Sequence, residues 1–81
     1  MIVVGYRAAS GSDPTGGRTR GYRIYGVDHV DGVVGLMPIN EFLPGGALRE
    51  VFPHPLELML GKRVTIHKDS YGRLCEFEIN G

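Results

Sequence analysis

Residues 60–79 constrain the fold more than any other part of the chain, because they have the pattern of two short strands joined by a tight turn. Apolar residues alternate with polar ones on both sides of a polar break. They are Val64 and Ile66 before the break and Cys75, Phe77 and Ile79 after it. Period-two alternation is typical of strands with one buried face, and Gly72 lies where a hairpin needs a positive φ angle. An isolated hairpin is marginal in water, so the other residues must cover its apolar face.

Length and composition predict one small domain spanning residues 1–81. The single cysteine excludes an internal disulfide and fits a reducing cytoplasm, so we expect a cytoplasmic protein. No apolar run is long enough for a membrane span, and we expect no membrane partner. Because Cys75 alternates with polar residues and lies on the same expected face as Phe77 and Ile79, we predict that it is a small buried hydrophobe and not a reactive thiol.

The charge is unevenly distributed along the sequence. The formal net charge is zero, which argues against strong nonspecific binding to nucleic acid. Residues 1–23 nevertheless carry four arginines and one aspartate, residues 24–58 carry five acidic residues and one arginine, and residues 59–81 lean basic again. If the two ends meet in space, they form a local positive patch.

Three further strands are expected ahead of the hairpin. They lie at residues 2–8, 21–27 and 33–37. Residues 10–20 are rich in Gly, Ser and Pro and indicate a long loop between the first two. Pro38 is expected to end the third strand or to mark an edge. On the second strand Tyr22 and Ile24 share one face, while Arg23 and Tyr25 share the other.

The segment between the third strand and the hairpin has a weaker pattern. Residues 40–43 fit one helical turn, and residues 47–52 fit either a short helix or an extended piece. Residues 55–60 indicate a short helix with Pro in its first turn and Gly61 at its end. Five short strands with a helix between the third and fourth predict an all-β fold, a small closed barrel of the OB type. An SH3-like barrel is the alternative.

Two stretches of the chain resemble the S1-type RNA-binding domain, an OB-fold repeat. Residues 31–42 contain the Gly-Leu step of its third strand, followed by an Ile-Asn-Glu-Phe segment. Residues 54–79 contain a short helix, the start of a fourth strand and an Asp-x-x-Gly-Arg turn. The resemblance covers about half of the chain. It implies an OB barrel that binds single-stranded RNA.

OB folds bind ligands on the second and third strands, flanked by the first connection and the last turn. Basic and aromatic residues fall in these places. They are Arg18 and Arg20 on the first connection, Arg23 and Tyr25 on the second strand, and His67, Lys68, Tyr71 and Arg73 around the last turn. Arginine and lysine suit phosphates, and each aromatic ring that stacks a base contributes about 1–3 kcal/mol. We therefore expect a non-enzymatic module that binds RNA or another single-stranded nucleic acid weakly and in a salt-sensitive way.

A protein-interaction module is the alternative function. In that reading, apolar residues of the 38–55 segment form a patch for a protein partner or a second copy of the chain. They are Phe42, Leu43, Val51 and Phe52. The sequence contains neither a nucleophile elbow nor a phosphate-binding loop, so we expect no enzyme. It also lacks Cys/His spacing typical of zinc sites, so we expect no metal and no other cofactor.

Overall fold

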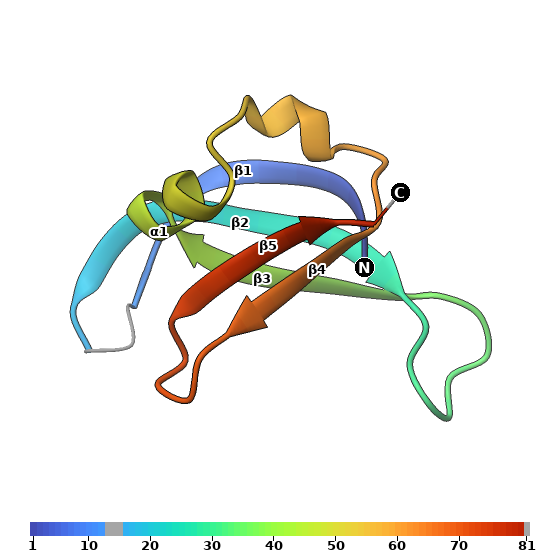
Figure 1. Ribbon diagram of the computed structural model, residues 1–81. Coiled ribbons are helices and arrows are strands. Elements are labelled where there is room, and N and C mark those ends of the chain that lie inside the picture. Colours follow the sequence, from blue (N-terminus) through green and yellow to red (C-terminus); the bar gives the residue numbers. More distant parts are fainter. Residues whose placement is uncertain (13–15, 81) are drawn as a thin grey trace.

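The computed structural model describes residues 1–12 and 16–80, and it is mostly β, with five strands and one short α-helix (Figure 1). The elements are β1 (Ile2–Ser12), β2 (Arg18–Asp28), β3 (Met37–Pro44), α1 (Gly45–Val51), a 3₁₀ helix (Leu56–Met59), β4 (Val64–Lys68) and β5 (Leu74–Ile79). The expected five strands, with a helix after the third, are confirmed. No helix in the described part of the chain has the length and apolarity needed to cross a bilayer.

The strands form two antiparallel sheets, which backbone hydrogen bonds connect at the start of β1. One sheet has the order β1-β2-β3 and the other is the β4-β5 hairpin. Ile2 bridges Arg63, and the Val3 N–H donates to the Lys62 carbonyl at 3.0 Å. The Val64 N–H donates to the Met1 carbonyl at 2.8 Å. Through this connection the strand order runs β3-β2-β1-β4-β5.

A closed barrel was expected, and the two sheets do not close into one. Among the described residues no strand pairing joins β3 to β5. Instead, an ion pair between Lys68, at the end of β4, and Glu41, on β3, connects the two sheets on this side. Figure 1 shows the β4–β5 hairpin crossing β3 obliquely, which separates the two edges that a closed barrel would pair.

The core lies between the two sheets and is covered by α1 and the 3₁₀ helix. Its buried residues are Val3, Ile24, Leu43, Leu48, Phe52, Met59, Val64, Leu74 and Phe77. Helix α1 packs against β2, β3 and β5, and Leu48 is its buried residue. Both sheets and both helical segments therefore contribute to one core.

A β-bulge in β1 breaks the expected alternation of that strand. Val3 pairs with Gly26 while Gly5 pairs with Tyr25, so Val4 is an extra residue. A bulge reverses which face the following side chains occupy. Val3, ahead of the bulge, is fully buried, and Val4 is 62% exposed. Beyond the bulge, Tyr6 lies opposite the buried Ile24 and packs against the core.

A second bulge corrects the prediction for Cys75. Pairing along β5 passes from Glu76 to Leu74, so Cys75 has no partner residue on β4. Leu74 and Phe77 then face the core on either side of the bulge. Cys75 is exposed, and the prediction that it is a buried hydrophobe is wrong for this reason.

Several expected boundaries also differ from the structure. The first two strands extend into residues expected to be loop, so that Ser12 pairs with Arg18; residues 13–15 of that loop lie outside the described part. The third strand was placed at 33–37, but β3 is Met37–Pro44, and the helical turn expected at 40–43 is strand. Among the described residues β3 pairs only with β2, so Pro38 fits an edge where no N–H is required.

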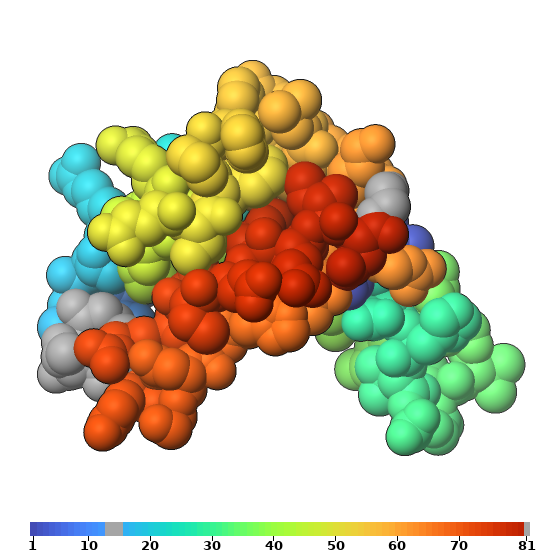
Figure 2. Space-filling model, viewed as in Figure 1, coloured from blue at the N-terminus to red at the C-terminus, as the bar shows by residue number. Residues whose placement is uncertain are grey.

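Residues 29–36, which link β2 to β3, project from the body of the protein. Figure 2 shows them as the green lobe at the lower right. All of these residues are exposed, and Val34 is 102% exposed. Residues 33–36, which were expected to belong to the third strand, are therefore part of a surface loop.

Candidate nucleic-acid interface

The side of the β1-β2-β3 sheet that faces away from the core carries a cluster of basic, aromatic and amide side chains. Residues directly opposite one another in an antiparallel sheet point to the same face. Arg7 is opposite Arg23, which is opposite Phe42, and Tyr25 is opposite Asn40 in the next row. We call these five residues the arginine–aromatic face.

Neutral groups hold both arginines of the arginine–aromatic face in place. The Arg7 Nε–H donates to the Tyr25 hydroxyl at 2.8 Å, and Arg23 Nη1 donates to Asn40 Oδ1 at 2.7 Å. The Arg23 guanidinium also lies 6.0 Å from the centre of the Phe42 ring. Neither arginine forms an ion pair with any described carboxylate. Their positive charges are therefore positioned without being neutralised.

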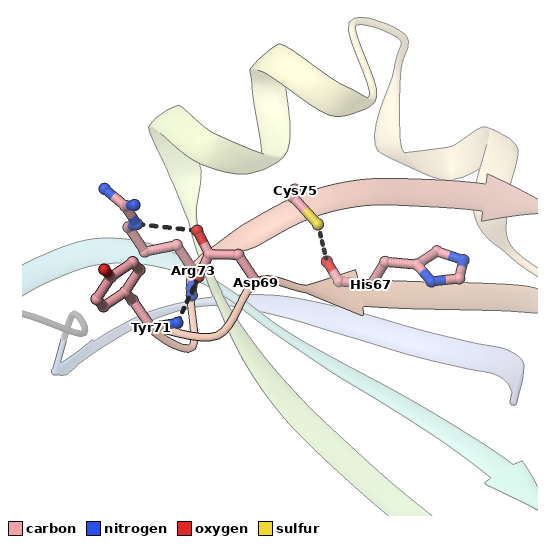
Figure 3. Close-up of polar contacts among 5 residues, drawn as sticks. All are labelled: His67, Asp69, Tyr71, Arg73 and Cys75. Carbon is pink, nitrogen blue, oxygen red and sulfur yellow. Dashed lines mark hydrogen bonds and ion pairs between the residues drawn. The ribbon is translucent and has the colours of Figure 1, made fainter.

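The turn between β4 and β5 is organised by the Asp69 carboxylate. It accepts hydrogen bonds from the backbone N–H groups of Tyr71 and Arg73, both at 2.9 Å, and from Arg73 Nε at 3.1 Å (Figure 3). The backbone N–H of Arg73 is the main cause that holds the pKa of Asp69 below its usual value. The Arg73 guanidinium lies 5.2 Å from the centre of the Tyr71 ring. The turn thus presents an exposed aromatic ring beside a guanidinium group.

One cleft of about 760 Å³ connects this turn with the first hairpin and with β3. Its lining includes Ser12, Thr19, Phe42, Lys68, Tyr71 and Arg73. In Figure 2 the β4–β5 turn, in orange, lies at the same end of the molecule as the β1–β2 hairpin, in blue. Because Phe42 belongs both to the cleft and to the arginine–aromatic face, the two form a continuous surface. The face that carries Arg7 and Arg23 is therefore continuous with the turn that carries Lys68 and Tyr71.

Arg18 and Arg20 lie apart from Arg23 and Tyr25. Alternation along β2 directs Arg18 and Arg20 to the side of the sheet that carries Ile24. Arg20 lines a different hollow, together with Arg49 of α1. The structure therefore does not bring Arg18 and Arg20 onto the arginine–aromatic face.

His67 is also separate from the aromatic and basic groups of the turn. Its imidazole points away from Tyr71 and Arg73 in Figure 3. Its Nε2 lies 3.5 Å from Glu78 Oε2, and its partner across the hairpin is Glu76. Two carboxylates beside the ring repel a phosphate. Lys68 does border the cleft, but its ammonium is paired with Glu41.

Sequence reasoning missed three residues of the arginine–aromatic face. Arg7 belongs to the strand expected at residues 2–8 but was not identified as a binding residue, because its partner Tyr25 follows only from the register of β1 on β2. Asn40 and Phe42 were expected in a helical turn. No local pattern identifies them, because their position depends on where β3 begins.

The apolar patch expected for a protein partner is not formed as expected. Leu43 and Phe52 are buried in the core, while Phe42 and Val51 are half-buried. Exposed large apolar side chains gather instead near the β2–β3 loop. They are Val30, Val33, Val34, Leu36 and Met37. A protein partner or a second copy stays a prediction, and any apolar contact would come from a different segment.

Comparison with known proteins gives no family for this chain. No family model, no curated protein and no solved structure matches it. The functional argument therefore rests on the geometry described above.

Proposed function

We propose that this chain is a non-enzymatic binding module for single-stranded RNA that uses the arginine–aromatic face and the adjoining cleft. One observation carries the proposal. Arg7 and Arg23 are held by neutral partners next to the rings of Tyr25 and Phe42, and the described residues of that face include no carboxylate. Positive groups interleaved with aromatic rings are the usual means of holding a single strand.

The architecture supports an OB-type reading of this surface. The strand order β3-β2-β1-β4-β5, with α1 placed after β3, is the order that an OB barrel would have before its last edge closes. In OB folds the second and third strands bind the ligand, flanked by the first connection and the last turn. The proposed surface occupies these elements and adds Arg7 of β1.

The basic and the aromatic side chains of the proposed surface have different roles. Arg7 uses Nε for its bond to Tyr25, and Arg23 uses Nη1 for its bond to Asn40. The other N–H groups of both guanidinium groups are left to donate to phosphates. Tyr25 and Phe42 offer rings to neighbouring bases, and Tyr71, which is 74% exposed, offers a third ring across the cleft. Arg73 stands beside that ring and adds a second phosphate contact.

Affinity is expected to be modest. The net charge is zero, and Glu50 and Asp69 also line the cleft. Counterion release makes such binding fall steeply as salt rises, with a slope of about 0.7 per phosphate contact for single strands.

The test is a fluorescence anisotropy titration of labelled single-stranded RNA at low salt. Tyr25→Ala is expected to weaken binding by about 1–3 kcal/mol, because it removes a stacking ring and releases Arg7. Arg23→Gln is expected to weaken binding and to reduce the salt slope by about 0.7. Arg49→Gln is the matched control, because it removes the same charge from α1, on the other side of β2.

Three results would contradict the proposal. They are absence of binding by the wild type, equal affinity for the wild type and both face variants, and an equal loss with Arg49→Gln. A single-stranded DNA of the same sequence is titrated in parallel. Tighter binding of the DNA would overturn the assignment to RNA.

A further inference from the structure

The outward side of the β4–β5 hairpin gathers three side chains that ligate metals. His67 is directly opposite Glu76, and Glu78 lies two residues further along the same strand, opposite Thr65. One donor atom from each of His67, Glu76 and Glu78 lies within 4.8 Å of the other two. They belong to β4 and β5, so the hairpin itself sets their spacing.

Negative charge dominates this cluster, which holds two glutamates and one histidine. Carboxylate oxygens of Glu76 and Glu78 lie within 4.8 Å of each other and of a ring nitrogen of His67. Two ionised carboxylates at this separation repel each other. Among the described residues, no lysine or arginine forms an ion pair with either glutamate.

The imidazole supplies an independent observation. His67 Nε2 is shielded from solvent although its ring is partly exposed, and it has no hydrogen-bond partner in the described part of the chain. A shielded polar nitrogen without a partner is unfavourable, and such atoms call for an explanation such as an ion. This nitrogen lies 3.5 Å from Glu78 Oε2.

We propose that His67, Glu76 and Glu78 bind one divalent transition-metal cation, with Zn²⁺ as the representative ion. One imidazole nitrogen and two carboxylate oxygens form a donor set that suits Zn²⁺ and its neighbours, whereas Mg²⁺ and Ca²⁺ prefer oxygen ligands alone. The cation relieves the repulsion between the glutamates and provides a partner for Nε2. Three protein ligands leave the remaining coordination positions to water or to a partner. This site does not depend on the proposed RNA interface.

The test is calorimetric titration of the full chain with ZnCl₂. We expect saturable binding of one ion per chain, reversed by EDTA. Glu76→Gln and Glu78→Gln are each expected to weaken it by about tenfold or more, because an amide is a poorer ligand than a carboxylate. Both side chains are on the surface, so circular dichroism without metal is expected to show unchanged folding of these variants.

Two control variants separate this site from other metal-binding groups. His54→Asn removes an exposed histidine elsewhere and is expected to leave Zn²⁺ affinity unchanged. Cys75→Ser removes an exposed thiol whose Sγ lies 3.3 Å from the His67 carbonyl oxygen, and it is also expected to leave affinity unchanged. In NMR spectra the ring signals of His67 should respond to Zn²⁺ at one equivalent, ahead of those of His29 and His54.

Several results would overturn the proposal. They are the absence of saturable Zn²⁺ binding, unchanged binding in both glutamine variants, loss of binding in Cys75→Ser, and a response of His29 or His54 that precedes that of His67. Loss of Zn²⁺ binding together with intact RNA binding in the glutamine variants is the expected combination. This combination would show that the Zn²⁺ site and the RNA interface are separate.

Discussion

At the residue scale, Gly21 is a position where the fold requires the absence of a side chain. A Cβ there would lie 2.9 Å from the Gly45 nitrogen and the Pro44 Cα, and closer still to the Leu43 carbonyl oxygen. These are backbone atoms of the neighbouring segment, so they cannot move aside without disturbing the pairing of β2 with β3. Gly21→Ala is therefore expected to lower the free energy of unfolding by about 1–3 kcal/mol, measured by urea denaturation.

Gly46 provides the matched control for this substitution. It lies in α1, its φ angle is negative, and a Cβ there would meet no atom within 4 Å. Gly46→Ala is expected to raise the free energy of unfolding by about 0.4–1 kcal/mol, because alanine restricts the unfolded chain. Equal losses in the two variants would show that close approach at Gly21 is not the cause.

At the scale of elements, Asp28 holds the end of β2 against the start of β1. Its Oδ1 accepts a hydrogen bond from the His29 N–H at 2.9 Å, and its Oδ2 lies 3.3 Å from the N-terminal ammonium. The His29 N–H is the largest cause that holds the pKa of Asp28 below its usual value, and the N-terminal ammonium comes next. The ionised carboxylate therefore stabilises the join between the two strands.

This depression of the pKa predicts a pH dependence of stability. The unfolded value for an aspartate is about 3.9, and the folded value of Asp28 lies below its usual range. The stabilisation is then complete above the unfolded pKa and is lost as the pH falls through the folded pKa. The thermal midpoint of the wild type should exceed that of Asp28→Asn near neutral pH, and the difference should shrink in acid. Asp31→Asn, in the exposed loop, is the control and should show no such difference.

At the scale of the whole molecule, α1 packs against both sheets and buries Leu48 in the core they share. Leu48 is 1% exposed, and α1 contacts β2 and β3 of one sheet and β5 of the other. Leu48→Ala is expected to lower the free energy of unfolding by about 2–5 kcal/mol, since it leaves a cavity where the sheets meet. Urea denaturation measures the loss. That is a large part of the stability of about 5–15 kcal/mol of a typical domain.

Val34 offers a control for the core substitution. Its side chain is fully exposed in the β2–β3 loop. Val34→Ala removes apolar volume from the surface and is expected to change the free energy of unfolding by no more than about 0.5 kcal/mol. A similar loss for both variants would contradict the role assigned to Leu48.

The sequence by itself determined that residues 60–79 form two strands joined by a turn. The alternation at Val64 and Ile66 correctly indicated β4, and Gly61 and Gly72 have φ angles of 76° and 81°. It also indicated that Ile24 faces inward while Arg23 and Tyr25 share the opposite face. These features depend on a residue and its near neighbours, so sequence spacing encodes them.

Only the tertiary structure decided the register of the strands and the composition of the binding surface. The bulges at Val4 and Cys75 change which faces are buried, and a bulge exists only with respect to a partner strand. Arg7 meets Tyr25, and Phe42 joins them, through pairings between distant segments. Local spacing cannot specify such pairings, because a shift of one residue moves every side chain to the opposite face.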